Sequence, residues 1–127
     1  MIKKKLDNYR QKKRCTLLGV GPMSKNCVDA TIELANESDA PLMLIASRRQ
    51  IDAEAFGGGY VNNWTTEEYA QYVIENDKKG KVILARDHGG PWQNPVEIEQ
   101  ELSLRQAMES AKKSYHADIK SGFEIIH

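Results

Sequence analysis

The stretch Val-Ile-Leu-Ala-Arg-Asp-His-Gly-Gly-Pro, residues 82–91, decides how this chain is expected to fold. An apolar run of the kind that forms a buried strand ends in an acid, an imidazole and two glycines. Parallel α/β proteins hold their functional groups at the carboxyl ends of strands, where the loops begin. The stretch therefore predicts a strand over 81–86 and a functional loop that starts at Asp87.

Other apolar runs of the chain alternate with segments of helical periodicity. Residues 41–46 are continuously apolar, which indicates a strand covered on both faces and hence a parallel sheet. Shorter runs over 16–21 and 123–126 predict a first strand and the start of a fourth. Alternation of strand and helix is typical of right-handed parallel crossover units.

The crossover helices have recognisable boundaries and apolar faces. Thr65 followed by Glu68 forms a capping box, and Trp64 is placed to pack onto Tyr69. Gly80 is the predicted end of that helix, because glycine adopts the left-handed C-cap conformation. The preceding helix places on one face Val28, Ile32 and Ala35. The last helix, which Gly122 ends, carries on one side Leu104, Ala107, Met108, Ala111, Tyr115 and Ile119.

The predicted fold class is α/β, built from parallel βα units. The loops after the second and third strands are long and the returns are short, which favours the N-terminal half of a TIM-type (β/α)8 barrel. A small open, flavodoxin-like parallel sheet has the same asymmetry and remains the alternative. Residues 1–127 are predicted to form a single domain or a partial barrel. An N-terminal helix covers 1–14, and 15–127 hold three βα units and the start of a fourth strand.

The composition excludes several classes of protein. Eighteen basic and eighteen acidic residues cancel, so no overall field favours nucleic acid, and no apolar stretch is long enough to span a membrane. The basic residues near the start recur around Ile2, Leu6 and Tyr9, which predicts an amphipathic helix with a solvated face rather than a nucleic-acid arm. Cys15 and Cys27 are interpreted as small buried residues of a cytoplasmic protein.

Asp87 and His88 are the strongest candidate site residues. A carboxylate and an imidazole can serve as general acid/base and metal ligand. Both can reach one pocket only if the backbone turns at residues 89–90. The alternative is that Asp87 caps the turn and His88 packs under the loop. His116, on the last helix, is predicted to be exposed.

A second group of candidates follows the strand over 41–46. Arg48 and Arg49 can clamp a phosphate or carboxylate group, or can pair with Asp52 or Glu54 on the surface. The glycines before Tyr60 allow close backbone approach or lid motion, or form a flexible connector. Residues 19–22, Gly-Val-Gly-Pro, lack the third glycine of a dinucleotide fingerprint, which favours a tight turn there instead.

Four blocks in order resemble the accessory subunit of tagatose-bisphosphate aldolase. They are Gly-Pro-Met-Ser-Lys-Asn-Cys-Val-Asp-Ala (21–30), Ala-Ser-Arg-Arg-Gln-Ile (46–51), Gly-Gly-Gly-Tyr (57–60) and Asp-His-Gly-Gly-Pro (87–91). The resemblance runs from about residue 14 to residue 127 and implies an N-terminal part of a TIM-type barrel. That family is related to the class II, zinc-dependent sugar-phosphate aldolases.

The resemblance also implies roles for individual residues. Asp87 would be the acid/base and His88 a zinc ligand, although one aspartate and one histidine fall short of the ligands that zinc needs. The substrate-binding residues would be Ser47, Arg48, Arg49, Gln50, Gly58, Gly59 and Tyr60. The sequence departs from the family at Ile45, at Arg49 and at residues 85–86, which places additional arginines near the presumed pocket.

The expected function lies in sugar-phosphate metabolism. The protein would support or perform metal-dependent aldol cleavage of a ketose bisphosphate, with a sugar phosphate as ligand and a catalytic aldolase subunit or a second copy as partner. The alternative is a non-enzymatic module that binds a phosphosugar or stabilises another subunit.

Overall fold

The computed structural model describes residues 2–12 and 16–127, so Cys15 lies outside the described residues. The helices are α1 (Ile2–Lys12), α2 (Lys25–Glu37), α3 (Thr66–Asn76), α4 (Pro95–Glu99) and α5 (Leu104–Ser121), with a 3-10 turn η1 (Glu54–Phe56). The strands are β1 (Gly19–Val20), β2 (Leu42–Ala46), β3 (Val82–Arg86) and β4 (Ile125–Ile126). The predicted order of strands and crossover helices is confirmed, and so is a helix near the start of the chain.

The four strands form one parallel sheet in the order β1-β2-β3-β4. In its centre, Leu44 lies beside Leu84 and Ala46 lies beside Arg86. The predicted α/β class with parallel βα units is therefore confirmed. The outer strands β1 and β4 are two residues long, shorter than their apolar runs predicted.

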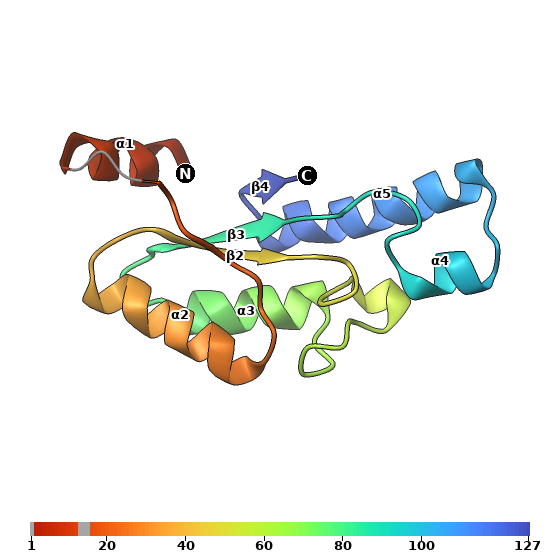
Figure 1. The fold of residues 1–127 in the computed structure, drawn as a ribbon, viewed down its shortest axis with the longest axis horizontal. Coiled ribbons are helices and arrows are strands. Elements are labelled where there is room, and N and C mark those ends of the chain that lie inside the picture. The colour runs from red at the N-terminus through yellow and green to blue at the C-terminus, as the bar shows by residue number, and fades with distance from the viewer. Residues whose placement is uncertain (1, 13–15) are drawn as a thin grey trace.

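The helices α2 and α3 cover one face of this sheet, and α3 packs against α5 (Figure 1). Alternate residues of the central strands, including Leu42, Leu44 and Leu84, point into this core, where they meet Val28 and Tyr69. On the opposite side of the sheet from α2 and α3 lies α1 (Figure 1). The strand order does not reverse within the described residues, whereas a doubly wound sheet reverses at its switch point.

Helix α1 is attached near the amino end of β3. Lys5 Nζ donates hydrogen bonds to the carbonyl of Val82 and to Glu124 Oε1, both at 2.7 Å. Ile2, Leu6 and Tyr9 are half-buried, which confirms the predicted amphipathic helix. Among the described residues, no helix is both long and apolar enough to cross a membrane.

The capping signals are largely confirmed. Thr65 and Glu68 form both hydrogen bonds of the capping box, and the rings of Trp64 and Tyr69 lie 5.8 Å apart. Gly122, at φ 89°, ends α5. The prediction for Gly80 is wrong, because α3 ends four residues earlier. There the side chain of the C-cap residue, Asp77, accepts a hydrogen bond from the N–H of Val82 and turns the chain into β3.

The predicted apolar face of the last helix is partly wrong. Leu104, Met108 and Ile119 are 59%, 42% and 63% exposed. The buried face of α5 consists instead of small and polar residues, namely Ala107, Ser110, Ala111, Ser114, Ala117 and Asp118. The helix is oriented in this way because arginines and acids from the strand ends form hydrogen bonds with its serines and with its aspartate.

Two smaller corrections concern the loops and a cysteine. A separate short helix, α4, precedes α5, and a Ser103/Gln106 capping box starts α5. The pattern of Ser103 followed three residues later by Gln106 is the signal that could have predicted this boundary. Cys27 is half-buried rather than buried, and its thiol lies 3.7 Å from the carbonyl oxygen of Gly21.

Candidate functional site

The carboxyl ends of the strands bring the predicted site residues to one rim of the sheet. Ser47 follows β2, Asp87 follows β3 and His127 follows β4. Backbone hydrogen bonds hold these ends together, from the N–H of Asp87 to the carbonyl of Ala46 (2.9 Å) and from the N–H of His127 to the carbonyl of Arg86 (3.1 Å). We call Ser47, Gln50, Tyr60, Asp87, His88 and His127 the rim.

Asp87 lies between two imidazoles. Its Oδ2 atom is 2.7 Å from His88 Nδ1, and its Oδ1 atom is 3.3 Å from His127 Nδ1. The side chains of Asp87, His88 and His127 are 38%, 63% and 85% exposed, so a ligand can reach all three. His127 was not predicted as a site residue, because only the parallel pairing of β3 and β4 brings it beside Asp87.

The neighbours of Asp87 keep its carboxyl group ionised. Partial burial raises the pKa of Asp87, but hydrogen bonds and charge interaction with His88, and a hydrogen bond with His127, outweigh that effect. The pKa of Asp87 therefore lies below its usual value. At neutral pH the carboxylate is a hydrogen-bond acceptor, and the lowered pKa makes it a weaker base than an ordinary aspartate.

The backbone turns at His88 itself. Its φ of 48° lies in the left-handed region, which few non-glycine residues adopt, and this turn brings the imidazole back onto Asp87. Both side chains thus reach one place, although the turn was predicted at the following glycines. Gly89 has another function, because a Cβ atom there would lie 2.4 Å from the ring of Tyr115 and 2.9 Å from the carbonyl oxygen of His127.

Gln50 connects the loops that follow β1 and β2. Its Oε1 accepts a hydrogen bond from the N–H of Ser47 (2.8 Å), and its Nε2 donates to the carbonyl of Pro22 (2.8 Å). Nε2 also lies 3.5 Å from the sulfur of Met23. The side chain of Gln50 therefore holds two loops together, and the structure shows it bonded within the protein.

The glycine-rich loop is packed against the backbone of Gln50. A Cβ atom on Gly59 would lie 2.1 Å from the carbonyl oxygen of Gln50, which confirms the predicted close backbone approach. A Cβ atom on Gly58 would lie 2.7 Å from the carbonyl oxygen of Trp64. Tyr60, 58% exposed, projects from this loop, and its hydroxyl lies 3.8 Å from the sulfur of Met23.

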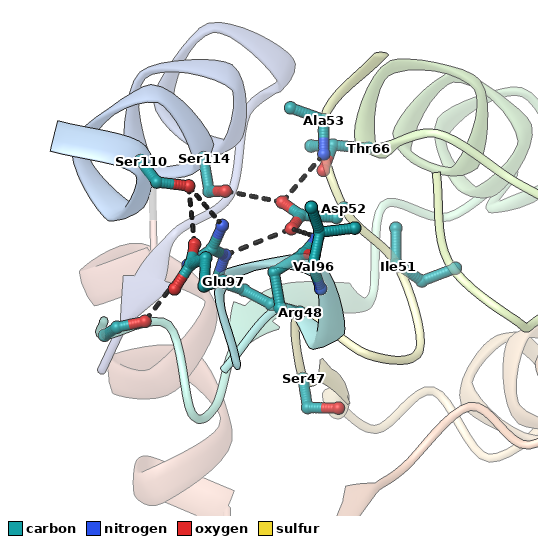
Figure 2. Close-up of polar contacts among 12 residues, drawn as sticks. Ser47, Arg48, Ile51, Asp52, Ala53, Thr66, Val96, Glu97, Ser110 and Ser114 are labelled. Atoms are coloured by element: carbon teal, nitrogen blue, oxygen red, sulfur yellow. Dashed lines mark hydrogen bonds and ion pairs between the residues drawn. The ribbon is translucent and has the colours of Figure 1, made fainter. Parts of the chain in front are cut away.

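The two neighbouring arginines have opposite environments. Arg49 is exposed, as a residue that contacts a ligand would be. Arg48 is fully buried, and its guanidinium contacts Asp52 Oδ2 at 3.1 Å and Glu97 Oε1 at 2.6 Å (Figure 2). The predicted alternative, a pairing with Asp52, is therefore correct in partner, but the pair lies in the interior rather than on the surface.

Asp52 is the most highly coordinated acid of this interior. Besides Arg48, its carboxylate accepts hydrogen bonds from the N–H of Ala53 (2.9 Å), from Asn94 Nδ2 (2.8 Å) and from the hydroxyl of Ser114 (Figure 2). The side chain of Asp52 is completely buried. Such a carboxylate is stable in the interior because donors surround it.

A second buried pair lies at the end of β3. Arg86 donates from Nε and Nη2 to the two oxygens of Asp118, and from Nη1 to the carbonyl of Ile51 at 2.6 Å. Burial raises the pKa of Asp118, and the hydrogen bonds from Arg86 oppose that rise. The additional arginine expected near the presumed pocket, Arg86, thus lies inside the protein and not at the rim.

We call the buried residues Arg48, Asp52, Arg86, Asn94, Glu97, Ser110, Ser114 and Asp118 the inner network. Sequence reasoning missed most of it. The only signal is spacing, because Ser110, Ser114 and Asp118 recur every four residues and so share one face of α5. Their partners come from segments that are distant in sequence. The apolar residues of α5 were therefore the clearer signal in the sequence, and they predicted the wrong buried face for this helix.

The described residues do not form a complete zinc site. Within 2–12 and 16–127, no group of three or more His, Cys, Asp and Glu side chains is arranged to hold a metal ion. His88 Nδ1 is directed at Asp87, which leaves Nε2 as the nitrogen that could bind a metal. The role of His88 as a zinc ligand therefore stays a prediction.

A surface cavity of about 420 Å³ lies beside the inner network, between η1, α4 and α5. Asn94, Glu97 and Ser110 form part of its wall, and Phe56 and Leu102 are among its apolar lining residues. None of the rim residues lines this cavity. The predicted site and this cavity are therefore separate features.

Comparison with known proteins supports the fold. The chain is similar to the crystal structure of a probable tagatose 6 phosphate kinase from Sinorhizobium meliloti 1021, with a TM-score of 0.70 and 22% sequence identity. The match covers 89% of this chain and 28% of that chain, so this chain spans little more than a quarter of that protein. No family model and no curated protein matches the chain. At this identity the likeness shows a shared arrangement of strands and helices.

Proposed function

We propose that the rim binds a phosphorylated sugar and that the protein acts in sugar-phosphate metabolism. The observation that carries this proposal is the position of Asp87 between His88 and His127, at the carboxyl ends of adjacent parallel strands. Ligands of parallel α/β folds bind at this end of the sheet. The name of the structural neighbour and the four blocks that resemble the aldolase accessory subunit support the choice of a sugar phosphate.

The rim has the groups that such a ligand needs. The partly exposed Asp87 carboxylate can accept a hydrogen bond from a sugar hydroxyl. The imidazole N–H groups and the exposed Arg49 can donate hydrogen bonds to a phosphate group. The hydroxyl of Tyr60 projects beside Met23 and can bind a further hydroxyl.

Within this proposal, we place the chain in a TIM-type barrel that supports a catalytic aldolase subunit. The sequential strand order and the helices α2 and α3 on one face support this placement. The blocks that resemble the accessory subunit favour a supporting role.

Aldol cleavage by this protein is the second candidate, and the geometry of Asp87 favours it. The carboxylate would accept the proton of the hydroxyl on the carbon that becomes the aldehyde. The carbon–carbon bond then breaks, and its electron pair passes to the carbonyl-bearing fragment as an enolate. The lowered pKa of Asp87 makes its carboxylate a weak base for this step, so binding and support come first.

The test is a calorimetric titration of the purified protein with tagatose 1,6-bisphosphate and fructose 1,6-bisphosphate. We expect Asp87→Asn to weaken binding at least tenfold, because the carboxylate is lost, and His116→Gln to bind as the unaltered protein does. His116 is a suitable control because it is an exposed histidine on α5 that is not one of the rim residues. Equal affinity of Asp87→Asn, or equally tight binding of inorganic phosphate, would contradict the proposal.

The two roles are separated by a second measurement. A supporting subunit has no cleavage activity alone and co-elutes with a class II aldolase in size-exclusion chromatography, raising that enzyme's activity or melting temperature. An enzyme releases a triose phosphate from the ketose bisphosphate without a partner, and Asp87→Asn abolishes that release. Failure of both measurements would remove the aldolase assignment.

A further inference from the structure

We infer that Arg48 is a positioning residue that holds two rim loops in one arrangement, rather than a residue that contacts the ligand. The first loop, residues 47–63, carries Gln50 and Tyr60, and the second, residues 87–94, carries Asp87 and His88. The inference deepens the proposed function, on which it rests for the identity of the site.

The side chain of Arg48 points into the protein interior. After β2 the chain makes a tight turn, in which the N–H groups of Gln50 and Ile51 both donate to the carbonyl of Ser47, at 3.1 and 3.0 Å. This turn sends Arg48 inward, with no exposed surface, and leaves Arg49 exposed. A ligand at the rim can therefore meet Arg49 but not the Arg48 guanidinium.

The hydrogen-bond and ion-pair partners of Arg48 come from several segments of the chain. Arg48 Nε donates to Asp52 in its own loop, and Nη1 donates to the carbonyl of Gly90 in the second loop at 3.1 Å. Nη1 also contacts Glu97 of α4, and Nη2 donates to Ser110 of α5 at 3.2 Å (Figure 2). All three guanidinium nitrogens are thus bonded, and they join four separate segments of the chain.

Arg48 and its partner Gly90 are close in sequence to the rim residues. Gly90 is two residues from His88, and Arg48 is next to Ser47 in sequence and two residues from Gln50. Glu97, which contacts Arg48, also accepts a hydrogen bond from the N–H of Trp92 in the second loop. A displacement of the guanidinium would therefore move both groups of rim residues at once.

The first test is hydrogen–deuterium exchange of the ligand-free protein, read by mass spectrometry. In Arg48→Lys, which keeps the charge but loses the planar fork, we expect exchange to become at least tenfold faster in both 47–61 and 87–94. Peptides from α2 should keep the rate of the unaltered protein. The matched control is Arg49→Lys, in which neither loop should change. Should Arg48→Lys fail to fold, Ser110→Ala removes one bond to the guanidinium and should show the same two-loop pattern more weakly.

Two outcomes of this measurement would overturn the inference. Faster exchange in 47–61 alone would mean that Arg48 orders only its own loop. An equal increase throughout the chain, including α2, would mean that Arg48 serves only general stability.

The second test measures affinity for the ketose bisphosphate. We expect Arg48→Lys to weaken binding about tenfold, although the side chain does not reach the rim, and Arg105→Lys on α5 to leave it unchanged. Unaltered affinity of Arg48→Lys would overturn the positioning role. If the unaltered protein binds no ketose bisphosphate, the proposed function fails, and the exchange of the ligand-free protein still decides whether Arg48 couples the two loops.

Discussion

The rim and the inner network contain the same kinds of residue in opposite surroundings. At the rim, Asp87 and His88 form a contact of 2.7 Å with side chains that are 38% and 63% exposed. In the inner network, Arg48 and Asp52 form a contact of 3.1 Å with no exposed surface. An exposed pair can exchange its partner for a ligand, whereas a buried pair that lost its partner would leave an uncompensated charge.

This difference explains why neighbouring residues have different roles. Arg86, the last residue of β3, is completely buried against Asp118, whereas Asp87, the next residue, lies beyond the strand with a partly exposed side chain. The turn after β2 separates the buried Arg48 from the exposed Arg49. The sequence therefore shows which charged residues lie near the strand ends. Their burial in the folded protein decides which of them a ligand can contact.

The largest expected effect follows from breaking a buried pair. Asp118→Ala leaves the guanidinium of Arg86 without its carboxylate in the interior, which typically costs about 3–5 kcal/mol of unfolding free energy. Chemical denaturation monitored by circular dichroism measures this loss. Glu109→Ala, which removes the exposed partner of Lys112, is the control and should cost about 1 kcal/mol or less. Similar losses in both variants would show that burial does not separate the two kinds of pair.

An intermediate effect is expected from the two adjacent glycines of the second loop. Gly89→Ala places a Cβ atom 2.4 Å from the Tyr115 ring and 2.8 Å from Arg86 Cγ, so neighbours must shift at a cost of about 1–3 kcal/mol. Gly90→Ala meets no atom within 4 Å, and its stability should remain within about 0.5 kcal/mol. Thermal melting of the two variants compares them directly, and equal melting temperatures would refute the close packing beneath the rim.

The smallest expected effect is the pH dependence contributed by Asp87. Its pKa in the folded protein is lowered from the usual 3.8, so its contacts stabilise the folded state above that pH and cease to do so as the pH falls through the lower folded value. Because the group is exposed to solvent, the contribution should stay below about 1 kcal/mol. Denaturation curves between pH 2 and 6 should show the unaltered protein losing its advantage over Asp87→Asn as the medium is acidified. A constant difference across that range would contradict the lowered pKa.

Much of the architecture could be predicted because its signals are local. Continuous apolar runs predicted the strands, Thr65 and Glu68 predicted the start of α3, and Gly122 predicted the end of α5. The place of Asp87 at a strand end could be predicted from its position after β3, whereas its pairing with His88 was not predicted and accompanies the left-handed turn at His88. The contact of Asp87 with His127 could not, since the two are 40 residues apart in sequence.

The buried face of α5 shows where local signals fail. Leu104, Met108 and Ile119 have the spacing of a core stripe, yet the structure buries Ser110 and Ser114 instead. Apolar residues need only avoid water, but a buried charge such as Asp52 requires donors at fixed distances and directions. That requirement orients the helix, and it depends on partners from β2, β3 and the loops between them.

The amino-acid sequence by itself determined the order of strands and helices, the parallel class of the sheet, and the loop that holds Asp87. Apolar periodicity and caps act over a few residues, so they can be read along the chain. Only the tertiary structure decided which charged residues face solvent, how Arg48 joins two loops, and that His127 meets Asp87. Those outcomes depend on hydrogen bonds and ion pairs between segments that are distant in sequence. The energies of these interactions depend on burial and geometry, which a local sequence pattern does not specify.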